Sequence, residues 1–440
     1  MKIKIKSAGI IRFILFYSIV VNFMVFTAGF PSMLLYFNDL LVLVLMVNIF
    51  GSLVKNVKIA LPWVVKGAIG ILLLIVLLAY VLNLYSPLLL LWGGRNNFRA
   101  IIFFVACCMF LEKRDVYLIC NILIALLPLN VLLCTVQYLR AINSADARVL
   151  KFVGDYVGGI FGDKQSCNRM LNIYISFVFT WVYVQLQMKE CSIKKAALIF
   201  LGCVYVAILS ELKVVLVEFV VIMFIVIWLI QRKINKVLLT LLCVVAAISI
   251  IYAVNPSALD IFRSMDSFAE YASASSYGVN SLNRLTVIPY IQERFFSGNI
   301  LKTLFGVGLG NADASNFSFL TSHIYRQHGY LKYHYFMSGH LFFEIGLLGL
   351  LAYLSIFIMM YIYYARKLSR RRAVNSLECA GVVFNAIALL CIFYNTSLRS
   401  EVSSYMAFFF LSIPIIWDNR CSESDYSYLQ RNSRRLVVRW

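Results

Sequence analysis

The stretch VKGAIGILLLIVLLAYVLNLY, residues 65–85, indicates the class of fold, because its only charged residue is Lys66. A bilayer core takes about 20 predominantly apolar helical residues to cross. Similar runs recur along the chain of 440 residues. They lie over about 10–30, 34–53, 65–85, 100–111, 116–138, 169–188, 196–210, 214–230, 237–253, 336–364, 379–398 and 402–417. The sequence therefore predicts an all-α polytopic membrane protein with about 12 transmembrane helices.

The composition supports this class. Hydrophobic residues make up 62% of the chain and charged residues 14%, whereas globular chains average about 45–50% and about 25%. A mean hydropathy of +0.84 argues against a disordered chain and against a soluble enzyme. The formal net charge is +20. In a soluble protein that charge would suggest nucleic acid, but here we expect contact with membrane lipid and no nucleic acid partner.

The positions of Lys and Arg predict the orientation, because cytoplasmic loops are enriched in them. With the N-terminus inside, about 25 of the 40 basic residues fall on the inner side. We therefore expect both termini in the cytoplasm. Residues 1–253 would hold the first nine transmembrane helices, 254–335 one large outer loop with amphipathic helices, 336–417 the last three transmembrane helices, and 418–440 a basic cytoplasmic tail.

Several basic residues remain on the outer side, where the positive-inside rule disfavours them. A guanidinium group binds phosphate oxygens through two parallel hydrogen bonds, so a ring of such groups suits a lipid-linked diphosphate. The alternative is that these side chains reach toward lipid head groups or pair with outer acids. The candidates for diphosphate binding are Arg99, Arg169, Lys213, Arg284, Arg294 and Arg399.

The segment 280–294 is expected to form an amphipathic helix. Its apolar residues recur every three or four positions. Arg284 and Arg294 would lie about 80° apart around such a helix and could face one cavity. The alternative is a helix lying on the membrane surface. The Gly-rich segment 305–311 lacks the strand context of a dinucleotide loop. We expect there a flexible loop, or a close backbone approach to a sugar or phosphate.

All four histidines lie between His323 and His340, at spacings that do not match a helical metal pair, so no metal is predicted. His340 is expected at the outer mouth of a span, with Glu344 on the same helix face. A carboxylate one turn away could orient the imidazole as a general base. The alternative is a helix cap with a polar interhelical contact. Asp39 and Glu218 fall within predicted spans, where either a functional role or a structural hydrogen bond is expected.

At these residues the chain resembles the superfamily of Wzy-type O-antigen polymerases and O-antigen ligases. One pattern is the segment around Arg284 followed by the Gly-rich turn 305–311. A second is His340 with Glu344-x-Gly346-Leu-Leu-Gly349 downstream. The third is Ser210-Glu-Leu-Lys213, where relatives often show Ser-Arg, so Lys213 departs from the pattern. The local match covers about 210–360, and the rest of the resemblance lies in the topology.

The resemblance implies a glycosyltransferase of the bacterial inner membrane that acts in the periplasm on undecaprenyl-diphosphate-linked glycans. A polymerase transfers the growing chain to the terminal sugar of a new repeat. Arg284, supported by Arg399, Lys213 and Arg99, would neutralise the diphosphate, with Arg169 and Arg294 as further contacts. His340 would act as the base and Glu344 would orient it. A chain-length regulator is the protein partner that the resemblance suggests.

Two other functions remain open at this stage. A ligase would transfer the finished chain to lipid A–core, and a flippase would move lipid-linked sugars without a reaction. A flippase is expected to line a central cavity with charge in mid-span and to show repeated halves. In this sequence the polar groups gather at one face and in one large outer loop. The first outer loop has no pair of acids to hold a metal. We therefore expect a metal-independent reaction without a cofactor.

Overall fold

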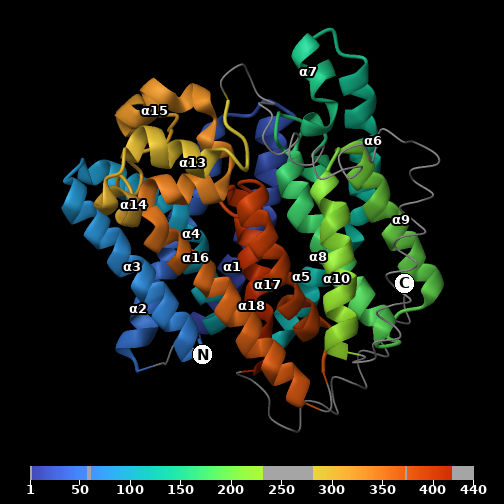
Figure 1. The fold of residues 1–440 in the computed structure, drawn as a ribbon. Helices are drawn as coiled ribbons and strands as arrows, with labels where there is room; N and C mark the ends of the chain where they lie inside the picture. Colours follow the sequence, from blue (N-terminus) through green and yellow to red (C-terminus); the bar gives the residue numbers. More distant parts are fainter. Residues whose placement is uncertain (1, 57–60, 231–280, 372–373, 419–440) are drawn as a thin grey trace.

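The computed structural model describes residues 2–56, 61–230, 281–371 and 374–418. These residues form helices and turns and contain no β-strand (Figure 1). The prediction of an all-α fold is confirmed for this part of the chain. The predicted span over 237–253, the first part of the outer loop up to residue 280 and the tail from residue 419 lie outside the described residues.

Seven helical segments are long and apolar enough to cross a membrane, as expected of a multi-pass membrane protein. They comprise α1 (Lys2–Phe26), η1 (Ser32–Tyr36) with α2 (Phe37–Val54), α3 (Trp63–Asn83), α5 (Lys113–Ala125) with α6 (Leu127–Ile142), α10 (Lys213–Ile230), α16 (Met337–Arg370) and α17 (Ser376–Tyr394). The outer faces of α2 and α3 remain exposed and apolar. Of the most apolar stretch of each span, only 22% of the residues are buried for η1 with α2 and 33% for α3. Such faces suit lipid as the surrounding medium.

Four more predicted spans are also helices, but each is shorter or less apolar than the seven above. They are α4 (Pro87–Phe110), α8 (Asn168–Gln187), α9 (Ile193–Leu209) and α18 (Glu401–Asp418). The short span predicted over 100–111 is the second half of α4, which continues from Pro87 without a break. Most of α8 and α18 is buried within the bundle. A helix covered by protein on all sides can carry polar residues at positions where a lipid-facing helix cannot.

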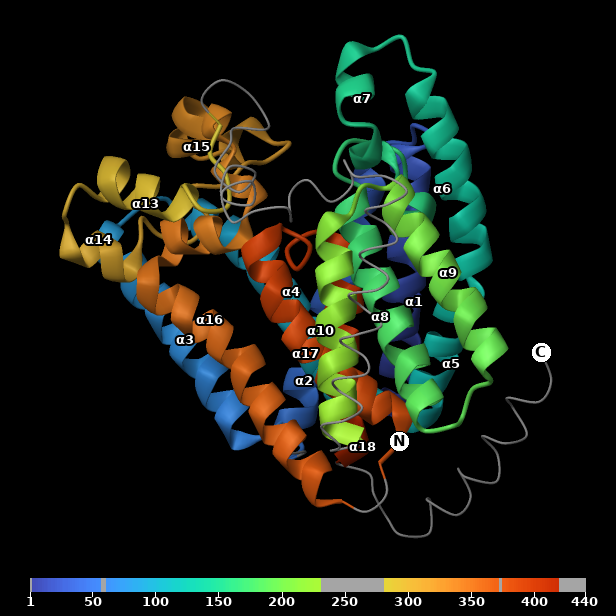
Figure 2. The ribbon, with the colours of Figure 1, turned by 45° about the vertical axis from the view of Figure 1, so that its right-hand side comes forward.

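The described part of the outer loop forms a cap of short helices at one end of the bundle, where α3 ends and α16 begins (Figures 1 and 2). The elements of this cap are α13 (Val287–Ile291), the π-helix η5 (Gln292–Phe296), α14 (Ile300–Phe305), η6 (Ser318–Leu320), α15 (His323–His328), η7 (Gly329–Leu331) and η8 (Tyr333–Tyr335). The loop between α6 and α8 holds α7 (Ala147–Lys151), η2 (Val153–Tyr156) and η3 (Gly159–Phe161). The first residues of α1 and the last of α18 lie at the opposite end (Figure 2).

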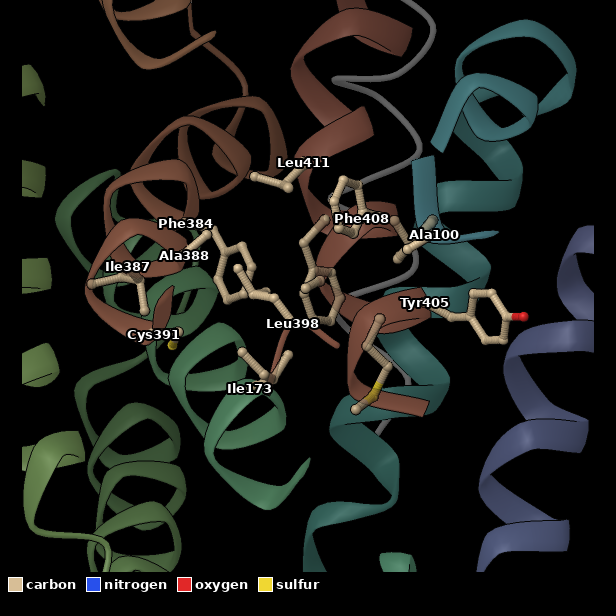
Figure 3. Close-up of a cluster of buried hydrophobic side chains, with 14 of the residues drawn as sticks. Ala100, Ile173, Phe384, Ile387, Ala388, Cys391, Leu398, Tyr405, Phe408 and Leu411 are labelled. Atoms are coloured by element: carbon tan, nitrogen blue, oxygen red, sulfur yellow. The ribbon is translucent and has the colours of Figure 1, made fainter. Parts of the chain in front are cut away.

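The core joins α4, α8, α17 and α18 through aromatic side chains. The rings of Phe177 and Phe410 stack with centroids 3.5 Å apart, and Phe384 packs edge-on against both. Figure 3 shows Leu398 within this cluster, beside Ile173 and Phe384. Leu398 lies in the turn between α17 and α18 and is 2% exposed. The core therefore anchors that turn.

Glu218, one of the two acids predicted within spans, is fully buried between helices. Its carboxylate accepts hydrogen bonds from Ser176 (2.5 Å) and Asn172 (3.2 Å) of α8. These contacts favour the structural reading of Glu218, because a buried carboxylate is stabilised by such donors.

Candidate functional site

The turn over residues 395–400, hereafter the α17–α18 turn, is the centre of the polar region at the capped end. Its own side chains hold its shape. The hydroxyl of Ser397 contacts Asn395 Oδ1 (2.5 Å) and donates to the backbone oxygen of Arg169 (2.9 Å). Ser403 Oγ donates to the carbonyl of Ser397 (2.5 Å). With Leu398 buried in the core, the turn is a rigid support for the charged groups around it.

Three arginines from separate parts of the chain donate hydrogen bonds to this turn or to the residue before it. Arg284 Nε donates to the carbonyl of Tyr394 (3.1 Å). Arg169, in the first turn of α8, donates to Thr396 Oγ1 (2.9 Å). Arg99 of α4 reaches the carbonyl of Arg399 at 3.5 Å. Arg399 itself belongs to the turn, so four of the predicted phosphate-binding residues meet at one place.

Carboxylates neutralise part of this cluster. Arg399 is paired with Asp313 of the outer loop. Arg99 pairs with Glu401 (3.2 Å) and lies 3.7 Å from Asp39, which also binds Arg95 at 2.6 Å. Among the described residues, no carboxylate lies within ion-pair distance of Arg169, and its Nε lacks a hydrogen-bond partner. Arg169 therefore offers an unpaired positive charge to an added anion.

Arg284 is held by rings as well as by the turn. Its guanidinium lies 4.1 Å from the ring centroid of Tyr394 and 5.5 Å from that of Phe336. Stacking of this kind fixes the plane of a guanidinium group and leaves its edge for hydrogen bonds. The rings therefore orient the charge of Arg284 beside the α17–α18 turn.

The expected single helix over 280–294 is not present in its described part. The helix begins at Val287, and Arg284 lies in the turn before it. Asn283 and Thr286 close this turn, since the backbone N–H of Asn283 donates to Thr286 Oγ1 (2.9 Å) and competes with helix formation. Arg284 and Arg294 therefore do not share a helix.

Two further predicted residues, Arg294 and Lys213, belong to other elements. Arg294 is exposed in η5 and forms no hydrogen bond or ion pair with any described residue. Lys213 begins α10, beside the junction where Ser210 accepts a hydrogen bond from Asn168 (3.2 Å). Arg294 therefore forms no hydrogen bond or ion pair with the α17–α18 turn, and Lys213 belongs to the junction between α9 and α10.

His340 and Glu344 face each other on the first turns of α16, with His340 Nε2 3.4 Å from Glu344 Oε2. The other oxygen of Glu344 accepts a hydrogen bond from the backbone N–H of Gly310 (2.9 Å). The helix then breaks at Gly346, whose φ of 68° and ψ of −169° are not helical. The pair thus lies on a short helical segment that the outer loop holds from one side.

Asp313 completes this group and was not among the residues that the sequence indicated. One ligand atom each from Asp313, His340 and Glu344 lies within 4.8 Å of the others, and all three residues are buried. Asp313 also accepts from Asn96 of α4 (2.7 Å) and from the backbone N–H of Ala314 (2.8 Å). Its place after the Gly-rich turn is visible in the sequence, but nothing there links it to residues 340 and 399.

Burial alone would raise the pKa of the Asp313 carboxyl, but Arg399, His340 and the hydrogen bond from Asn96 outweigh it and hold that pKa below its usual value. Asp313 is therefore ionised at neutral pH. The neighbouring His334 shows the opposite balance. Burial, reinforced by His340 and Lys332, lowers the pKa of His334 to about 3, so that its ring stays neutral.

The Gly-rich segment is packed against the protein and is not the flexible loop that was one of the two expectations. Residues 306–310 are buried. The backbone N–H groups of Val307 and Gly308 donate to the carbonyls of Phe343 (3.0 Å) and Glu344 (2.8 Å). Gly310 has a φ of +83°, and a Cβ at this position would overlap the backbone of Leu89 and Gly93 in α4. The glycines let this segment lie close to α4 and α16.

We therefore expect Gly310→Ala to lower the stability of the protein by at least about 3 kcal/mol, because strain at positive φ adds to a backbone overlap. Gly70→Ala is the matched control. Gly70 is exposed on α3, and a Cβ there meets nothing within 4 Å. Thermal unfolding in detergent should show a large loss for Gly310→Ala and no loss for Gly70→Ala. Equal melting temperatures for the two variants would contradict the packing described here.

His340 is not at an open mouth, as the sequence suggested, but beneath the outer loop. Its side chain is 0% exposed, and neither ring nitrogen has a hydrogen-bond partner of good geometry. The ring of Tyr333 lies parallel to it, with centroids 6.2 Å apart, and Tyr333 donates a hydrogen bond to the carbonyl of Ala312 (2.7 Å). A substrate reaches His340 only if this layer moves.

Asp313, His340 and Glu344 are also the one described group with the residue types and spacing of a metal site. Their other contacts do not fit a divalent ion. The guanidinium of Arg399 and the amide of Asn96 both occupy the same oxygen of Asp313. A cation bound there would face the positive charge of Arg399 at close range, which costs free energy.

The chain matches no protein-family model, and no curated protein matches it. Fold and site together define a multi-pass membrane protein. It has a buried histidine–carboxylate group and an arginine cluster at one end.

Proposed function

We propose that this protein is a polysaccharide polymerase of the bacterial inner membrane, of the Wzy type. It transfers a growing glycan from undecaprenyl diphosphate to the terminal sugar hydroxyl of a new lipid-linked repeat unit, on the periplasmic side. One observation carries the proposal. Arginines from four separate segments meet at the α17–α18 turn, and Asp313 links that turn to His340 and Glu344.

The proposed reaction has simple chemistry. The acceptor hydroxyl loses its proton to His340 while its oxygen forms a bond to the anomeric carbon of the donor sugar. The bond from that carbon to the diphosphate oxygen breaks, and the diphosphate leaves with the bonding electrons. Negative charge therefore grows on the leaving group and positive charge on the imidazole. The arginine cluster stabilises the negative charge on the diphosphate, and a carboxylate stabilises the positive charge on the imidazole.

The side chains divide this work. Arg169, Arg284, Arg99 and Arg399 face the diphosphate, and Glu344 orients His340. Gly310 fixes Glu344 in turn through its backbone N–H. Because His340 is enclosed, binding of the acceptor has to displace the ring of Tyr333. If the outer loop closes again over the bound acceptor, it would also exclude water, which otherwise competes for the donor sugar.

The topology proposed for this function has about 12 spans, both termini in the cytoplasm and the α17–α18 turn in the periplasm. The substrate is lipid-linked, so it enters from the membrane. A chain-length regulator is the expected protein partner, and no nucleic acid is involved.

The function is tested by the lipopolysaccharide of a deletion strain, separated on a gel. Loss of a polymerase leaves lipid A–core capped with a single repeat unit, and a plasmid copy of the gene should restore the ladder. A strain without any capped core would contradict the proposal, and so would an unchanged ladder.

Analysis of the lipid-linked glycans from the same strain separates the two alternatives. Loss of a ligase leaves long polymers attached to undecaprenyl diphosphate, because polymerisation continues. Loss of a flippase leaves only single repeat units on that carrier, together with uncapped core. A polymerase deletion also leaves single repeats on the carrier, but the core is then capped.

We expect polymerisation by the purified protein to continue at an unchanged rate in excess EDTA. Arg399 occupies the position that a divalent ion would need beside Asp313, and arginines take over the neutralisation of the diphosphate. The measurement is product length on a gel with and without the chelator. A loss of activity that Mg²⁺ or Mn²⁺ restores would show that the group at Asp313 does hold a metal.

A further inference from the structure

Asp313 occupies the one position that joins the two halves of the proposed site. Its carboxylate contacts Arg399 of the α17–α18 turn. A carboxylate oxygen of Asp313 also lies within 4.8 Å of a ring nitrogen of His340 and of a carboxylate oxygen of Glu344 on α16. Asn96 of α4 donates to it at 2.7 Å and itself accepts a hydrogen bond from Arg95 (2.7 Å). With an exposed fraction of 3%, this carboxylate interacts with charges that water barely screens.

The charges around His340 are unbalanced before the reaction. With both carboxylates ionised and Arg399 positive, the group of Asp313, Glu344 and Arg399 would have a net charge of −1. A proton on His340 makes the group neutral. Buried groups of opposite charge that cancel avoid the cost of an isolated charge. The cluster is thus suited to accept one proton.

The titratable rings near this group add no charge at neutral pH. His334, on η8, stays neutral because burial lowers its pKa to about 3. Tyr333, also on η8, and Tyr85, which precedes α4, keep their protons because burial raises the pKa of each phenol. Arg99 is already paired with Glu401. Asp313 and Glu344 are the described carboxylates that lie beside His340.

We propose that Asp313 is a positioning residue of the transfer reaction, which fixes Arg399 at the diphosphate and stabilises the protonated form of His340. This inference rests on the proposed function for the reaction itself, but the arrangement of charges stands apart from it. The same carboxylate would thus couple the site that releases the diphosphate to the site that accepts the proton. Asn96 holds Asp313 in place for both tasks.

The electrostatic part is tested without any substrate. The exchange of the C2 proton of each histidine in deuterated buffer, followed by mass spectrometry over a range of pH, gives the pH at which each ring is half protonated. In Asp313→Asn we expect this midpoint for His340 to lie at lower pH than in the wild type, because an opposite charge at close range has been removed. The exposed His323 should not move and serves as the internal control.

Two more variants separate the charge of Asp313 from its structural role. Asp313→Glu keeps the charge and should leave the His340 midpoint close to that of the wild type. Asp39→Asn removes a carboxylate that pairs with Arg95 and Arg99 and should also leave it unchanged. The inference is overturned if the His340 midpoint is the same in Asp313→Asn as in the wild type, or if Asp39→Asn moves it equally.

Polymerisation by the same proteins then tests the link to function. The substrate is the lipid-linked repeat unit extracted from the deletion strain. We expect Asp313→Asn to lower kcat by more than tenfold with little change in KM, and its activity to extend to lower pH. If the His340 midpoint shifts in Asp313→Asn but the wild type makes no polymer, the proposed function is refuted. The role of Asp313 in the protonation of His340 would then still stand. An active wild type with an unaffected Asp313→Asn would refute only the inference about Asp313.

Discussion

His340→Ala should reduce the rate of polymerisation by about 10²–10⁴-fold, the usual contribution of a positioned general base. His340 is the one histidine that contacts a buried carboxylate of its own helix, Glu344. Without the imidazole, the acceptor hydroxyl would have to lose its proton to water in a buried site. In cells, the lipopolysaccharide ladder should collapse to core with a single repeat.

The design of this experiment has to separate catalysis from folding, because His340 is fully buried. His340→Gln keeps most of the volume and avoids the cavity that alanine leaves. His323→Ala removes an exposed histidine from α15 and should keep a normal ladder. All variants must first show wild-type amounts in the membrane. A full ladder in both His340 variants would rule out the base.

The second large effect is expected at Arg284. Arg284→Met should lower polymerisation by about 10²–10³-fold, the range measured when one group that stabilises developing charge is removed. Methionine keeps the length of the side chain and removes its charge. Arg284 Nε contacts Tyr394, the residue before the turn that binds Arg169 and contains Arg399, so the loss of its charge weakens the whole cluster.

Arg294→Met is the matched control for Arg284→Met. The sequence predicted one helix on which both arginines could face one cavity, whereas the structure puts Arg294 on the exposed side of η5. Arg294→Met should change the rate by no more than about threefold, as surface substitutions usually do. Equal losses in both variants would mean that the cavity follows the sequence-based helix and not the α17–α18 turn.

Much of the fold was accessible from the sequence because the bilayer imposes a simple rule on it. An apolar run such as 65–85 has to become a helix, since lipid offers no partner for backbone N–H and C=O groups. The same reasoning fails for helices inside the bundle. The polar residues of α8 and the arginines of α4 lower their hydropathy, and only tertiary packing shows that neighbouring helices cover them.

The shared helix face of His340 and Glu344 follows from their spacing alone, and the structure places their side chains 3.4 Å apart. The break at Gly346 and the burial of His340 do not follow from it. They depend on the Gly-rich segment, whose residues 307 and 308 bond to carbonyls of α16. A glycine pattern read alone cannot tell a ligand contact from a contact within the chain.

Sequence by itself determined that the chain forms apolar helices and which charged residues are unusual for their expected side of the membrane. The reason is that hydropathy and helical spacing act locally, within one segment. Tertiary structure alone decided which charges meet. Asp313 and Arg399 form an ion pair across 86 positions of sequence. Arg169 bonds to the α17–α18 turn and Arg284, from a separate segment, bonds to the residue before it. Contacts of this kind depend on how the helices pack, which no local pattern records.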